Sequence, residues 1–102
     1  MSDTEIALAA TGVNYGSSYD EAAFFEWLDK IPAVRSYNGE LRTLYIQVDA
    51  TADDESIYEL VSLFHRYHVD MVQLRVFDTE RIGEWFRKSD SYWYESVFGT
   101  SS

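Results

Sequence analysis

The spacing of apolar residues changes repeatedly along this chain, and that succession limits the folds it can adopt. Residues 5–11 carry no helical cap and run into a glycine, which indicates a first strand. Residues 18–31 and 51–68 place apolar side chains at helical spacing. Residues 33–49 and 69–77 alternate as strands do, and the first of these reads as a hairpin. The predicted order is therefore strand, helix, strand, strand, helix, strand.

Both predicted helices carry signals at their ends. Ser18 is a candidate N-cap, and Glu21 three residues later would complete a capping box. Pro32 ends the first helix, because proline lacks the N–H that a helix needs. Thr51 or Asp53 is predicted to cap the second.

The turn of the hairpin is predicted at Asn38-Gly39, because both residue types accept positive φ. Two short helices are expected to close the chain, over residues 80–88 and 91–98, with Gly99 as a stop. Their candidate caps are Asp78 or Thr79, and Ser89 or Asp90.

These elements predict an α+β fold, a βαββαβ ferredoxin-like two-layer sandwich with two short C-terminal helices. Residues 1–102 form a single globular domain, with flexible ends at 1–4 and 100–102. A three-layer or barstar-like arrangement of the same elements stays open. The residues predicted to face the two long helices are Leu44, Ile46, Val48, Val72, Leu74 and Val76.

Charge is the strongest global signal. Eighteen acidic residues face eight basic ones, a formal net charge of −10. Such a chain repels nucleic acid and anionic membranes and attracts a basic partner. A need for solubility alone would explain the same excess of acidic residues. The absence of cysteine fits a reducing compartment, and with no signal peptide expected at residues 1–10, the predicted location is the cytoplasm.

The two histidines, His65 and His68, lie three residues apart and close to Asp70. At 100° per residue, His68 lies about 20° from the centre of the apolar helix face and His65 about 80°. A zinc site needs three or four ligands, and no further ligand is adjacent. The sequence therefore predicts a helix end here, with neither a metal nor a catalytic group.

No other stretch points to chemistry. The glycines of residues 12–16 lack a following Gly-Lys-Ser/Thr, so no phosphate loop is predicted. No acidic pair has an apolar setting that would raise one pKa. We expect no cofactor and no enzyme activity. A small enzyme using His65, His68 or a carboxylate is the remaining catalytic hypothesis.

The outward sides of the two long helices are the candidate contact surface. In the βαββαβ order both helices cover one sheet face, so their acidic residues could form one surface. The C-terminal tyrosines 92 and 94 are a competing location, although such rings could equally cover the rim of a small core. The predicted partner-binding residues are Asp20, Glu21, Glu26, Asp53, Asp54, Glu55, Tyr58 and Glu59.

The stretches "FFEWLDKI", "LYIQVD", "ELVSLFHRYHVDMVQLRVF", "EWF" and "YWYESVFG" stand in an order that resembles small bacterial immunity proteins of contact-dependent growth inhibition and related polymorphic toxin systems. The resemblance covers roughly residues 20–99, is one of pattern and size, and supplies no site motif. It implies a cytoplasmic, non-enzymatic inhibitor that binds one cognate toxin domain, often a nuclease with a basic cleft. From the charge, no direct nucleic-acid or membrane binding is expected, and the protein is expected to be a monomer or weak homodimer. Another acidic inhibitor or regulatory module, such as a nucleic-acid-mimicking antidefence protein, is the alternative.

Overall fold

The computed structural model describes residues 5–78, 82–88 and 90–99. The expected flexible ends, 1–4 and 100–102, and the candidate caps Thr79 and Ser89 lie outside these residues.

Three antiparallel strands form the sheet. They are β1 (Glu5–Thr11), β2 (Val34–Glu40) and β3 (Thr43–Asp49), in the order β1-β3-β2. The central strand β3 places Ile46 opposite Leu8 on one side and opposite Tyr37 on the other. Both outer strands run antiparallel to β3, so β1 and β2 are parallel to each other. The first long helix connects β1 to β2, and β3 lies between these two strands in the sheet.

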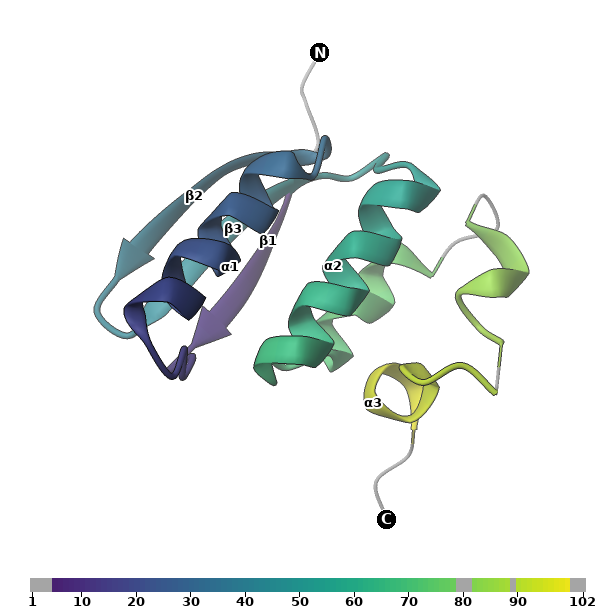
Figure 1. Ribbon diagram of the computed structural model, residues 1–102. Helices are drawn as coiled ribbons and strands as arrows, with labels where there is room; N and C mark the ends of the chain where they lie inside the picture. The colour runs from purple at the N-terminus through teal and green to yellow at the C-terminus, as the bar shows by residue number, and fades with distance from the viewer. Residues whose placement is uncertain (1–4, 79–81, 89, 100–102) are drawn as a thin grey trace.

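Two long helices, α1 (Ser18–Lys30) and α2 (Asp54–Tyr67), lie side by side on one face of the sheet and run in opposite directions (Figure 1). Phe24 and Leu28 of α1 are fully buried against α2 and the sheet. The α2 stripe is longer, and its fully buried members are Ser56, Ile57, Leu60, Val61, Leu63 and Phe64.

The local signals place the ends of the two long helices to within three residues. Of the two predicted caps, Asp53 and not Thr51 caps α2, and its side chain accepts a hydrogen bond from the Ser56 N–H. The N-cap of α1 is Ser17 rather than Ser18, because the Ser17 hydroxyl accepts from the Asp20 N–H. Pro32 follows the end of α1 at Lys30, as expected.

The hairpin is confirmed, but its turn is not at Asn38-Gly39. Glu40 pairs with Thr43, so Leu41 and Arg42 form the turn and β2 continues through Asn38. Leu41 has a φ of 57° and is fully exposed. A leucine in this left-handed region is strained, since its Cβ crowds the backbone.

The predicted fourth strand is wrong. Residues 72–77 form the 3-10 helix η1 (Val72–Phe77). Buried side chains there recur every three residues, at Met71, Leu74 and Phe77, which is the period of a 3-10 helix. Apolar and polar residues also alternate along this segment, but the three-residue spacing determines which side chains are buried.

The side chain of Gln73 joins η1 to the outer edge of β1. Its amide oxygen accepts from the Ala9 N–H and its amide nitrogen donates to the Ala9 carbonyl, both at 2.8 Å. One side chain thus makes the pair of bonds that a neighbouring strand would make. Val72 and Val76, predicted to face the helices, are instead 46% and 47% exposed.

The other four residues of that predicted set behave as expected, since Ile46, Val48 and Leu74 are buried and Leu44 is half-buried. The α+β class is therefore confirmed. The described residues contain three strands, so they do not form the four-stranded ferredoxin-like sheet.

The C-terminal segment packs along α2 on the side away from α1 (Figure 1). Within residues 82–99 the helical pieces are η2 (Gly83–Trp85) and α3 (Tyr94–Phe98), shorter than predicted. The indole of Trp93 is buried and donates to the Phe86 carbonyl at 2.9 Å. Gly99 does end α3. It does so in an extended conformation, and any Cβ there would clash with the Glu95 carbonyl oxygen.

Candidate functional site

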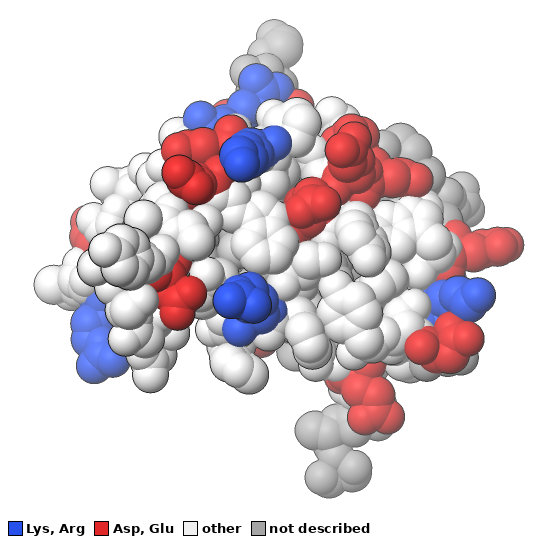
Figure 2. Space-filling view, viewed as in Figure 1, with Lys and Arg blue, Asp and Glu red and all other residues white. Residues whose placement is uncertain are grey.

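The helices α1 and α2 enclose a groove of about 400 Å³ where α1 ends and α2 begins. The antiparallel course of the two helices brings Glu26 of α1 beside Glu55 and Glu59 of α2. Figure 2 shows acidic side chains gathered over this end of the face, with a basic group among them. We call this site the helix groove, and its lining residues are Ala23, Glu26, Trp27, Lys30, Ile31, Pro32, Glu55 and Glu59.

Hydrogen bonds hold the walls of the helix groove in place. The Trp27 indole N–H donates to a Glu59 carboxylate oxygen at 2.8 Å, which links the two helices. The buried Ser56 hydroxyl accepts from the Ala33 N–H at 3.2 Å and ties the start of α2 to the segment after α1. The groove is therefore preformed, with two exposed glutamates and one glutamate fixed by the indole.

The structure places three of the eight predicted contact residues, Glu26, Glu55 and Glu59, in the helix groove. Asp53 and Asp54 begin α2 at the same end as the helix groove, and Tyr58 follows on the next turn. Asp20 and Glu21 do not join them. They lie in the first turn of α1, which the opposite helix direction places beside the end of α2 (Figure 1).

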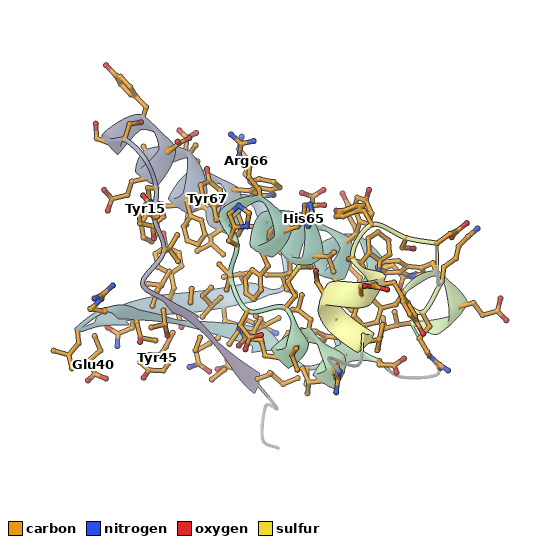
Figure 3. All side chains as sticks on the ribbon, turned by 90° about the horizontal axis from the view of Figure 1, so that it is seen from below. Tyr15, Glu40, Tyr45, His65, Arg66 and Tyr67 are labelled. Carbon is orange, nitrogen blue, oxygen red and sulfur yellow. The ribbon has the colours of Figure 1, made fainter. Side chains whose placement is uncertain are left out.

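At that far end the surface is aromatic with mixed charge. Tyr15 packs its ring 6.1 Å from Tyr67, and the Tyr67 hydroxyl donates to the Asp20 carbonyl at 3.3 Å (Figure 3). Arg66 and Asp20 line the same shallow pocket. Burial raises the pKa of the Tyr15 hydroxyl, and the nearby Glu21 carboxylate raises it further.

Tyr58 belongs to a second surface, formed by α2 and the C-terminal segment. Tyr58 and His65, seven residues apart, lie on one side of α2. Trp85 and Tyr92 of the later segment pack against them, with ring centroids 6.0 Å and 4.7 Å away respectively. We call this surface the aromatic strip: Tyr58, His65, Trp85 and Tyr92.

Sequence reasoning missed three parts of these surfaces. Trp27 and Trp85, which helical spacing alone would place in the core, are both half-buried and donate to carboxylates. His65 was placed on the flank, which is correct, but its contact with Tyr92 depends on the path of the C-terminal segment. The helical spacing from Tyr58 to His65 was the one signal available for this strip.

The expectation that His68 points toward the core is wrong. Helix α2 ends at Tyr67, and His68 has a left-handed φ of 59° and an exposed side chain. The two histidines line a pocket of about 340 Å³ with apolar residues and Ser96, and none of the described carboxylates lines it. Among the described residues, no group of three or more His, Cys, Asp or Glu could hold a metal ion.

The face of the sheet opposite the helices carries small and polar side chains. Tyr45 and Glu40 point away from the helices there, as Figure 3 shows. At the end of β3, Asp49 accepts from the Thr51 N–H and hydroxyl and pairs with Arg35. These bonds lower the pKa of Asp49 from 3.8 to about 2, and the hydrogen bond from the backbone N–H of Thr51 has the largest effect.

A further hollow of about 610 Å³ lies between the end of β1 and the hairpin turn. It is lined by both polar and apolar groups, including Val13, Leu41 and Arg42. The Arg42 guanidinium packs close to Gly12, whose φ is 60°. Among the described residues, no Asp, Glu, His or Cys lines this hollow.

No helix in the described part of the chain is long and apolar enough to cross a bilayer. Comparisons of the chain with protein-family models, with curated proteins and with solved structures found no match.

Proposed function

We propose that this protein is an immunity protein that binds a cognate toxin domain, a nuclease, and neutralises it by occupying its basic active-site cleft. The observation that carries the proposal is the helix groove, where carboxylates from two helices gather around a tryptophan. The comparisons supply no relative, so the proposal rests on this surface, on the net charge and on the sequence resemblance.

The mechanism is occlusion. A nuclease cleft is positive because its substrate is a polyanion, so an acidic surface is complementary to it. Glu26 and Glu55 are exposed and can pair with cleft cations, while Trp27 offers apolar area between them. The protein would act in the cytoplasm, where the nuclease would otherwise meet nucleic acid.

For the fold we infer a ferredoxin-like domain whose fourth strand has been replaced. Strand β3 lies between β1 and β2, as it does in that fold, and η1 returns to the outer edge of β1. The Gln73 amide takes the position in which the missing strand would pair.

The first test is neutralisation in cells. The proposal predicts that a reading frame beside this gene encodes a toxin domain, and that domain is expressed with and without this protein. Expression alone should stop growth, and co-expression should restore it. Continued growth arrest in the presence of well-folded protein would contradict the proposal.

The second test compares two double charge reversals with the same change of net charge. The groove variant is Glu26→Lys with Glu55→Lys, which leaves the Asp53 cap intact. The control is Glu5→Lys with Glu40→Lys, two exposed residues on the sheet. At low salt the groove variant should slow association with the toxin domain by about tenfold or more, because electrostatic steering acts on the association rate. Equal slowing by both variants would show that only the total charge matters.

A further inference from the structure

The aromatic strip is a continuous set of rings on the side of α2 away from α1. Trp93 forms its buried floor, with ring centroids 5.8 Å from Tyr58, 5.8 Å from Trp85 and 5.0 Å from Tyr92. These contacts are edge-to-face, the geometry that aromatic pairs prefer. The strip is therefore packed as a core would be, although one side of it faces solvent.

The outer rings remain accessible while their positions are fixed. Tyr58 is 44% exposed and Tyr92 is 48% exposed, whereas Trp93 is only 6% exposed. The Tyr92 hydroxyl is 2.9 Å from the Ser62 hydroxyl, and the Trp85 indole N–H donates to Asp54 at 3.2 Å. Rings held in this way lose little conformational entropy when a partner covers them.

Acidic residues lie near the aromatic strip, both along the chain and in the structure. Asp54 contacts Trp85 directly, and Glu84, Asp90 and Glu95 are exposed residues next to or near the ring-bearing positions. Figure 2 shows an uncharged area over the lower part of α2 and the segment beyond it, with acidic side chains above, beside and below, and basic side chains at its left and right. A cation approaching these rings is attracted by this border and by the net charge of −10.

We propose that the aromatic strip is a docking surface for an arginine-bearing segment of the protein's basic partner. Aromatic faces bordered by carboxylates suit guanidinium better than ammonium. The guanidinium is planar, stacks on rings and is weakly hydrated, whereas the lysine ammonium is a strongly hydrated point charge. The inference rests on the proposed function in one respect, that the partner is basic.

The experiment uses two peptides of equal length and charge, nonaarginine and nonalysine, with the full-length protein. Tryptophan fluorescence reports binding at about 0.15 M salt, where long-range attraction is screened beyond about 8 Å. The arginine peptide should bind about five- to tenfold more tightly, because stacking adds to charge attraction. Amide NMR shifts should locate it at Tyr58, Ser62 and Tyr92.

Variants then test whether the rings cause the preference. Tyr58→Leu with Tyr92→Leu should remove the preference for arginine and leave the affinity for nonalysine unchanged. Tyr45→Leu removes a ring of similar exposure from the opposite face of the sheet, and should keep the preference. Tyr58→Phe with Tyr92→Phe keeps the rings and should also keep it.

The outcomes separate this inference from the proposed function. If both peptides bind equally, or if the NMR shifts fall in the helix groove, the strip is not an arginine site, while the basic-partner proposal stands. If neither peptide binds, the basic-partner proposal fails as well. Because the shifts are measured on the wild-type protein, the result holds even if the leucine variant does not fold.

Discussion

Phe64 lies on the buried side of α2 and has none of its surface exposed. Replacement by alanine should lower the free energy of unfolding by about 3–5 kcal/mol, because a large cavity forms where neighbours cannot collapse. Chemical denaturation followed by circular dichroism measures this. As a control, Tyr45→Ala on the open sheet face should cost clearly less, since that ring is 38% exposed. An unchanged midpoint for Phe64→Ala would remove Phe64 from the core.

Asp49 gives the fold a dependence on acid pH. Its pKa of about 2 lies below the ordinary 3.8, so the folded state favours the ionised carboxylate. The resulting stabilisation is fully present above pH 3.8 and is lost as the pH falls toward about 2. The stability difference between the wild type and Asp49→Asn should therefore shrink across that window. An NMR titration of the Asp49 carboxyl carbon with a midpoint near 3.8 would contradict this assignment.

Among the elements, η1 depends most visibly on one polar side chain. Gln73→Met keeps the length of the side chain but removes both hydrogen bonds to Ala9. The loss should be about 1–3 kcal/mol, since each neutral hydrogen bond contributes about 0.5–1.5 kcal/mol. Hydrogen exchange of the Ala9 amide should also accelerate. Gln47→Met, on the neighbouring strand β3, is the control and should leave that exchange unchanged.

Patterns in the sequence predicted β1, both long helices and the hairpin. The long helices and the hairpin each have a single consistent period, and β1 was indicated by the absence of a helical cap and by the glycine that follows it. Residues 71–77 carry two periods at once, alternate residues and every third residue, and only packing decides between them. For a related reason, the sequence prediction grouped acidic residues that the structure places at opposite ends of the two helices. Asp20 and Glu21 were assigned by helix face alone, whereas the antiparallel course of α1 and α2 decides which ends meet. The aromatic strip required the path of residues 82–98, where local signals are weak.

For the molecule as a whole, a net charge of −10 opposes compaction. The described residues include two ion pairs, Arg35–Asp49 and Arg87–Asp78, which offset little of this excess. Raising sodium chloride from about 0.01 M to about 1 M shortens the screening length from about 30 Å to about 3 Å. The thermal midpoint should therefore rise by a few degrees. For the Glu26→Lys, Glu55→Lys variant, the thermal midpoint should rise less with salt. A wild-type midpoint that falls with salt would mean that attractive ion pairs dominate.

The hairpin turn offers a place to attach a probe. The chain has no cysteine, so Leu41→Cys would create a unique thiol for a dye or a surface tether. Leu41 is fully exposed, and loop tips of this kind tolerate change well. The turn lies at the end of the hairpin away from the start of α2 (Figure 1). A label there could follow encounters at the helix groove by energy transfer or single-molecule imaging without obstructing them.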